Sequence, residues 1–273
     1  ILHIFNSKYC LDKKKIENLP IGLFGDFYSH ELSFCLINAN DYKNLNKVFN
    51  KCNLKIKKIL LKSFVEGSYI SKTYSNHDTF FQIKINQNNS QIFYFENDSL
   101  KFEQNFDFGS DLVIRDITKI TSLKKDVVEK IINNMELNKD ISDDELVEEE
   151  LFGDENYRKI KKKLIYEIAA ARIQELSELM IFKNINLISY NKKVSVIFFK
   201  IKNKLHYECF KNTYNHYFSN NNNFVINFLK DITTEEVLSN ANGLIHFGWK
   251  KEAIPVSQPK KSLIARFFDG MFG

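Results

Sequence analysis

The chain has 273 residues, of which 44% are hydrophobic and 27% are charged, and its formal net charge is only +5. This composition is sufficient for a buried core in one large or two smaller domains. Acidic and basic residues are interspersed, whereas a nucleic-acid binder usually carries a concentrated basic face, so we expect no nucleic-acid partner. No run of about 18 apolar residues occurs, and we expect no membrane-spanning helix.

The residues that usually carry enzyme chemistry show no recognisable spacing. The four cysteines and six histidines are scattered, without the pairs that bind zinc, so we expect reduced thiols and no metal site. A P-loop, a dinucleotide fingerprint and a nucleophile elbow are all missing from the sequence. We therefore expect no catalytic residues.

The first 70 residues have the pattern of a small α/β unit. Three segments rich in β-forming residues are predicted as strands, namely Ile1–Phe5, Leu32–Ile37 and Lys55–Leu61. A helix is predicted between the last two, from Asp41 to Cys52, because its apolar residues recur at helical spacing. These are Leu45, Val48, Phe49 and Cys52.

The middle of the chain alternates between strand and helix patterns. Residues 79–108 are predicted as successive strands, with a hairpin turn at Glu96–Ser99. Residues 123–182 are predicted to be mainly helical, and the acidic stretch between Asp143 and Glu150 is interpreted as a solvated surface or an interaction patch. Val194–Ile201 is a nearly continuous apolar run, which predicts a strand buried on both faces.

The last regular helix is predicted after Thr233, with its apolar residues turned toward a core. Those residues are Val237, Leu238, Ala241, Leu244 and Ile245. After Trp249 the prolines Pro255 and Pro259 favour a linker.

The final 14 residues have the pattern of an amphipathic helix, with two lysines before it and apolar side chains along one half of the helical wheel. Such a helix is typical of a membrane surface, although docking on the protein's own core would give the same pattern. The predicted membrane-binding residues are Lys260, Lys261, Leu263, Ile264, Arg266, Phe267, Phe268, Met271 and Phe272.

Several segments, in chain order, resemble the FtsA family of actin-like bacterial cell-division proteins. The opening residues 1–25 are similar to the family's "LHxIP…Y…D…NPxGxxG" stretch, and residues 43–56 to the helix and strand that follow it. Residues 108–117 resemble "GGxxVTxDI", residues 165–179 resemble "IIxPRxxEL" with Arg172 on the arginine, and residues 241–248 resemble "AxGLLHYG". Each match is weak alone, but their order covers nearly the whole chain.

The resemblance implies an α/β, actin-like fold with two ribonuclease H-like halves around a nucleotide cleft. It also implies an inserted strand-helix-strand-strand (SHS2) subdomain and a C-terminal amphipathic helix. The expected segments are subdomain 1C at 1–70, incomplete at its start, the first part of 2A at 71–114, helical 2B at 115–182, the second part of 2A at 183–232, the terminal helix of 1A at 233–250, the linker at 251–259 and the membrane helix at 260–273.

The same resemblance implies a role and partners. The chain would tether FtsZ filaments to the cytoplasmic face of the inner membrane at the division site. Residues 115–182 would bind the C-terminal tail of FtsZ, subdomain 1C would recruit later division proteins, and self-association into filaments would multiply weak contacts with an anionic membrane.

The sequence departs from the family at the nucleotide cleft. Where the family has "DIGGGT", the aligned positions of this sequence have a lysine in place of the acid and contain no glycine. The candidate, degenerate nucleotide site consists of Lys84, Asn86, Gln87, Asn88, Asn89 and Gly109. The second glycine motif should fall near Phe198–Lys200, which also lacks glycine. ATP is therefore a doubtful cofactor and hydrolysis is not expected, although Lys84 could hold a phosphate directly.

Two alternatives remain open from the sequence. A membrane-associated actin-like filament protein or pilus-assembly adaptor would share the tail and the inserted subdomain. An actin-like ATPase, such as a sugar kinase or chaperone relative, would need the glycine hairpins and the catalytic acid that this sequence lacks.

Overall fold

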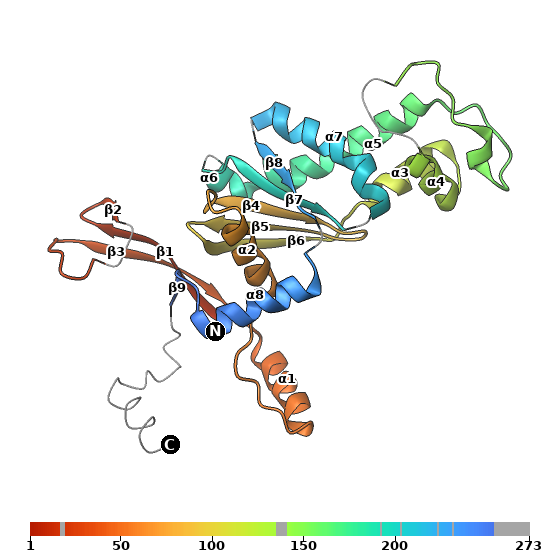
Figure 1. The fold of residues 1–273 in the computed structure, drawn as a ribbon. Coiled ribbons are helices and arrows are strands. Elements are labelled where there is room, and N and C mark those ends of the chain that lie inside the picture. The colour runs from red at the N-terminus through yellow and green to blue at the C-terminus, as the bar shows by residue number, and fades with distance from the viewer. Residues whose placement is uncertain are drawn as a thin grey trace. The chain divides into compact units, whose positions relative to one another are not determined.

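The computed structural model describes residues 1–16, 20–134, 141–191, 193–202, 204–222, 224–230 and 232–253 (Figure 1). The chain divides into two compact units. Unit 1 contains Ile1–Thr73, Asn97–Leu100 and the residues from Thr234 onward, whereas unit 2 contains Tyr74–Glu96 and Lys101–Thr233. The predicted linker and membrane helix lie outside the described residues from residue 254 onward.

The sheet of unit 1 is organised around its first strand. This sheet consists of β1 (His3–Leu11), β2 (Lys14–Ile16), β3 (Tyr28–Cys35) and β9 (Glu252–Ala253). β1 pairs antiparallel with each of the other three strands. Residues 252 and 253, which the sequence suggested as part of a linker, are thus a strand of this unit.

Three helices complete the described part of unit 1: α1 (Ala39–Lys51), α2 (Lys62–Thr73) and α8 (Thr234–Phe247). α1 forms where its apolar spacing predicted it, and the side chain of Asn38 caps it by accepting the backbone N–H of Asn40 at 2.8 Å.

The strand predicted at Lys55–Leu61 is not formed, so that prediction is wrong and the strand-helix-strand-strand order is not observed. Side chains hold this segment in place of a strand ladder. The backbone N–H of Leu61 donates to His3 Nε2 at 3.1 Å, and Lys58 Nζ donates to the carboxylate of Glu252 at 3.3 Å. Preference for the strand conformation depends strongly on context, so a segment rich in β-forming residues becomes a strand only where its backbone pairs with a neighbouring strand.

α8 also differs from its sequence pattern. Among the residues predicted to be buried, Leu244 is buried, but Leu238 is 63% exposed and Ile245 is 41% exposed. The helix packs against α2 partly through a polar side chain, because Asn240 Nδ2 donates to the carbonyl of Val65 and to Ser68 Oγ, both at 2.8 Å. The helix therefore buries an amide where the pattern suggested only apolar groups.

Hydrogen bonds to the carboxylate of Glu252 join β9 to the start of the chain. His3 is fully buried, and because its Nε2 accepts the Leu61 N–H, its Nδ1 donates to Glu252 Oε1 at 2.7 Å. Burial raises the pKa of the Glu252 carboxyl, but the His3 hydrogen bond and the charge of Lys58 outweigh it, so this pKa lies below its ordinary value of 4.5.

Unit 2 contains a five-stranded sheet in the order β6-β5-β4-β7-β8. Its strands are β4 (Phe80–Ile85), β5 (Ser90–Glu96), β6 (Ser99–Phe106), β7 (Val196–Ile201) and β8 (Val225–Phe228). β5 runs antiparallel to β4, whereas β7 is parallel to both β4 and β8. The predicted hairpin turn is present, and its two central residues, Asn97 and Asp98, have positive φ angles of 50° and 62°.

This strand order, with the first strand in the centre and only its hairpin partner reversed beside it, is that of a ribonuclease H-like half. The expected mixed α/β class and one such half are therefore confirmed. No second sheet of this kind is present among the described residues of unit 1. The run predicted at Val194–Ile201 is the strand β7, and four of its six residues are buried in succession.

The remaining elements of unit 2 are helical and share one core with the sheet. They are α3 (Asp111–Thr121), α4 (Lys125–Asn134), η1 (Glu149–Phe152), α5 (Lys162–Ser177), the π-helix η2 (Glu178–Phe182), η3 (Ile185–Leu187), α6 (Ile188–Asn191) and α7 (Lys204–Asn222). α7 covers one face of β7 and β8, where Tyr214 and Phe218 contact Phe199 (Figure 1). None of the described helices has the length and apolar character that crossing a bilayer requires.

The Glu252 network gives a prediction about stability and pH. Because its pKa is depressed on folding, this carboxylate stabilises the fold above pH 4.5, and the contribution is lost as the pH falls through the folded-state pKa. We expect Glu252→Gln to lower the free energy of unfolding by about 1–3 kcal/mol at pH 7, with a smaller difference at pH 4. Urea unfolding followed by the fluorescence of Trp249, the single tryptophan, reports on unit 1.

The matched control is Glu150→Gln, which removes the charge of an exposed carboxylate in unit 2 and should leave the Trp249 transition unchanged. Equal stability of wild type and Glu252→Gln at pH 7 would contradict the role assigned to this network.

Candidate functional site

The candidate nucleotide residues Asn86–Asn89 form the turn between β4 and β5. The backbone N–H of Asn86 donates to the carbonyl of Asn89 at 2.9 Å, and the two asparagine side chains are hydrogen-bonded to each other. No residue of this turn has a positive φ angle, so the backbone does not require glycine here. The turn is closed by asparagines where the resemblance led us to expect a glycine-rich loop.

The start of α3 is tied to this same turn. The backbone N–H groups of Ser110 and Asp111 donate to the carbonyls of Asn86 and Gln87 at 3.0 and 2.9 Å. A Cβ atom on Gly109 would overlap both of those carbonyl oxygens. The first amides of a helix are normally available to an anion, but here two amides at the start of α3 bind the protein's own backbone.

Lys84 lies on β4, one position before the end of the strand. Its ammonium group lies 4.6 Å from the centre of the Phe93 ring, which is a cation–π contact. In the parallel pairing of β4 with β7, Lys84 is directly opposite Lys200, so the two side chains project from the same face of the sheet. The sequence suggested Lys84 alone, and only the strand register reveals its neighbour.

These positions define the chemistry available at this end of the sheet. The structure brings Asn86–Asn89 and Gly109 together, and it places two lysines on the adjacent strands. Two ammonium groups on neighbouring strands can attract an anion, whereas an ammonium group cannot ligate a magnesium ion.

The helical region expected to bind a partner contains an ion pair between α3 and α5, in which Arg172 pairs with Asp116. Arg158, which precedes α5, donates to the carbonyl of Thr121 at the end of α3 at 3.1 Å. These two contacts indicate that the helices run antiparallel. The hydrogen bond from Arg172 to Asp116 raises the pKa of the guanidinium further above its usual range. The Arg172 side chain is thus paired and partly exposed.

Apolar side chains remain at the surface of these two helices. Ile120 on α3 is 59% exposed, and Leu164 on α5 is 40% exposed. Because the helices are antiparallel, Ile120 lies toward the first turns of α5, where Leu164 is located. A second, mixed apolar and charged surface of unit 2 is thus available to a ligand.

The acidic stretch between Asp143 and Glu150 is held against the start of α5. Lys163 pairs with Asp143, and Lys162 pairs with Glu148 at 2.5 Å. These hydrogen bonds lower the pKa of both carboxyl groups. Val147, within the same stretch, is buried, whereas the acidic side chains on either side of it are exposed.

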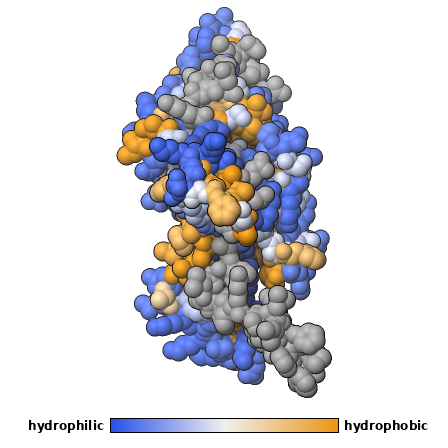
Figure 2. Space-filling view, turned by 90° about the vertical axis from the view of Figure 1, so that its left-hand side faces the viewer, coloured by the Kyte–Doolittle hydropathy of each residue, from blue (hydrophilic) through white to orange (hydrophobic). Residues whose placement is uncertain are grey.

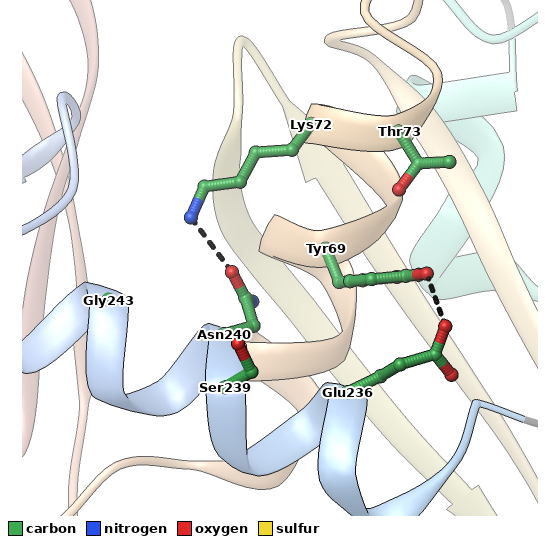
Figure 3. Close-up of a pocket in the computed structure, with 7 residues that line it drawn as sticks. All are labelled: Tyr69, Lys72, Thr73, Glu236, Ser239, Asn240 and Gly243. Atoms are coloured by element: carbon green, nitrogen blue, oxygen red, sulfur yellow. Dashed lines mark hydrogen bonds between the residues drawn. The ribbon is translucent and has the colours of Figure 1, made fainter.

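Unit 1 contains a polar cavity of about 440 Å³ that the sequence did not suggest (Figure 3). The hydroxyl of Tyr69 donates to Glu236 Oε1 at 3.0 Å, and Lys72 Nζ donates to Asn240 Oδ1 at 2.8 Å. Its lining residues are Tyr69, Lys72 and Thr73 from α2 and Glu236, Ser239, Asn240 and Gly243 from α8.

A signal for this cavity was present in the sequence. The four α8 residues recur at helical spacing, as do the three α2 residues, so each helix carries a stripe of mainly polar residues. The sequence analysis followed the apolar stripe of α8 instead. Two donor–acceptor pairs, Tyr69 with Glu236 and Lys72 with Asn240, cross the helix pair, which indicates a structural role in joining α2 to α8.

No known family model matches the chain, and no curated protein matches it. Solved structures do resemble it. MreB 5 of Spiroplasma citri bound to AMPPNP is 11% identical, with a TM-score of 0.49 over 76% of this chain and 65% of that one. The archaeal actin homolog Ta0583 is 10% identical, with a TM-score of 0.42 over 69% of this chain and 56% of that one.

The ethanolamine utilization protein EutJ from Carboxydothermus hydrogenoformans is 8% identical, with a TM-score of 0.41 over 70% of this chain and 57% of its own. The chain thus spans less than two thirds of each of these proteins. At such identities the similarity concerns the fold and not the activity, and the fold class here rests on the strand order of unit 2.

The contact between Gly109 and the β4–β5 turn gives a second prediction. We expect Gly109→Ala to lower the free energy of unfolding by about 1–3 kcal/mol, because the added methyl group must displace two backbone carbonyls. Urea unfolding followed by far-ultraviolet circular dichroism measures this loss.

Gly243→Ala is the matched control, since a Cβ at that helical position meets no atom within 4 Å. It should leave stability unchanged or raise it by up to about 1 kcal/mol. If both variants were as stable as the wild type, the close approach of α3 to the turn would be refuted.

Proposed function

We propose that this chain is an actin-like membrane adaptor of the bacterial division septum, which tethers FtsZ filaments to the cytoplasmic face of the inner membrane. The observation that carries the proposal is a ribonuclease H-like half, with a partly exposed helical region, in the same chain as an amphipathic tail sequence. The resemblance of the segments at 1–25, 108–117, 165–179 and 241–248 supports the FtsA family in particular.

The tail is the proposed membrane anchor. Its six apolar side chains give a gross gain on the order of 10 kcal/mol when partly buried, from which the cost of folding a short helix must be subtracted. One copy would therefore bind reversibly. We propose that self-association of the chain multiplies this contact and makes the tether firm.

The exposed surface of α3 and α5 is the proposed site for the C-terminal tail of FtsZ. Ile120 and Leu164 offer apolar contacts at this surface, and Arg172 adds a partly exposed cation. Such a combination of apolar anchors and an arginine suits a short peptide. Later division proteins would dock on unit 1.

We propose a binding role and no enzymatic activity at the sheet end. Lys84 replaces the acid that would position magnesium, and the turn at Asn86–Asn89 contains no glycine. If a nucleotide binds, Lys84 and Lys200 would contact its phosphates by charge. The alternative adaptor of a pilus apparatus shares these features and differs in its partner.

The anchor is tested by co-sedimentation with anionic vesicles in the presence of the FtsZ tail peptide. We expect the wild type to bring the peptide to the vesicles, and we expect Phe267→Glu with Phe268→Glu to weaken vesicle binding by about tenfold or more, because two charges enter the apolar half of the helix. The matched control is Ser262→Glu with Ala265→Glu, which adds the same charge to the polar half. Equal sedimentation of the Phe267/Phe268 variant and the wild type would remove the tail as the anchor.

The partner surface is tested by fluorescence anisotropy of the labelled FtsZ tail peptide in the absence of vesicles. We expect Ile120→Gln to weaken peptide binding roughly tenfold, which corresponds to the loss of an apolar contact of about 1–2 kcal/mol. Ile188→Gln alters an isoleucine of nearly equal exposure, 58% against 59%, elsewhere in unit 2 and should bind as the wild type does. If the wild type binds no peptide, the FtsZ role fails and the pilus-adaptor alternative is favoured.

A further inference from the structure

The helix α1 is well formed at both ends. Asn38 caps its N-terminus, Asp41 lies in its first turn and Lys51 in its last, which are the charges that the helix dipole favours. The chain leaves the helix at Asn53 in a left-handed conformation with a φ of 57°. These local features fix where the helix begins and ends.

No residue of α1 is buried. Its apolar side chains nevertheless lie on one arc of about 120° of the helix circumference, and all of them are exposed. They are Tyr42, Leu45, Val48 and Phe49, and the most exposed, Val48, is 61% accessible. Figure 2 shows that hydrophobic areas lie between hydrophilic ones on the face of the molecule that it displays.

The charge around this arc is almost entirely positive. Between residues 39 and 57 there are five lysines and a single acid, Asp41. The lysines are Lys43, Lys47, Lys51, Lys55 and Lys57, and all are exposed. The first three recur every four residues and so lie on the side of α1 opposite to the apolar arc.

We infer that α1 is a second membrane-binding element, which lies in the surface of an anionic bilayer with its apolar arc toward the acyl chains. An exposed arc of a few large apolar residues with lysines on the opposite face is the pattern of an interfacial helix. The inference goes beyond the proposed function, because it depends on neither FtsZ nor the C-terminal tail.

The charge distribution favours lipid over a protein as the occupant of this arc. Protein interfaces are depleted of lysine, whereas a juxtaposed anionic leaflet attracts several lysines at once. Lysine side chains are also long enough to reach phosphate groups from the polar side of a helix that lies in the surface. An isolated helix of 13 residues is marginal in water, so contact with lipid would also stabilise it.

The test uses the full chain carrying Phe267→Glu and Phe268→Glu, so that the tail is disabled. We expect this protein still to sediment with vesicles of phosphatidylcholine and phosphatidylserine, and not with phosphatidylcholine alone. Adding Val48→Glu should weaken the remaining binding by about tenfold or more, whereas Asn40→Glu, which adds the same charge on the polar side, should not. Replacing Lys43, Lys47 and Lys51 by glutamine should abolish the preference for phosphatidylserine. The substituted side chains are exposed, and circular dichroism checks that α1 persists.

Three results would overturn the inference. The tail-disabled protein could fail to bind mixed vesicles, in which case the tail is the anchor and the proposed function survives. Val48→Glu and Asn40→Glu could bind equally, in which case another surface makes the contact. Val48→Glu could instead change the sedimentation velocity without vesicles, in which case a second copy covers the arc. If Val48→Glu abolishes binding while the tail variant matches the wild type, the inference stands and the proposed tail anchor fails.

Discussion

Hydrogen bonds between the start of α3 and the β4–β5 turn constrain the candidate site more than any other contact. They direct two amides, Ser110 and Asp111, at backbone carbonyls, and they leave no room for a side chain at Gly109. The same contact fixes where α3 begins, and α3 in turn carries the aspartate that pairs with Arg172 on α5. The helical surface proposed for a partner and the degenerate turn are therefore parts of one connected framework.

Much of unit 2 could be predicted from local sequence. Alternating and continuous apolar runs predicted the strands β4 to β7, and the residues from Glu96 to Ser99 predicted the turn between β5 and β6. Both predictions were possible because strand burial and turn chemistry are local properties of the sequence. Non-local pairing decided the rest. Lys55–Leu61 has a strand pattern but no ladder, the two-residue strand β9 exists only because β1 offers an edge, and the pairing of Lys84 with Lys200 follows from register.

The resemblance aligned Asn86–Asn89 with the family's glycine motif, and the structure has the β4–β5 turn at these residues. The binding of that turn to α3 involves backbone atoms, whose partners no side-chain pattern reveals. In unit 1 a side-chain pattern was itself misleading. The apolar pattern on α8 predicted that Leu238 is buried, yet this residue is exposed and the amide of Asn240 is buried instead.

The pairing of β1 with β9 has a consequence for the order of folding. Unit 2 is nearly continuous in sequence, so it can assemble from contacts that become available as residues 74–233 leave the ribosome. Unit 1 is completed later, because His3 and Ile4, although they already pair with Cys35 and Phe34 of β3, lack their second partners until residues 252 and 253 have been made. The strands that pair in this sheet are therefore separated in sequence by nearly all of unit 2. During synthesis one edge of β1 stays unpaired after unit 2 has been made, and that edge is then exposed to strands of other chains.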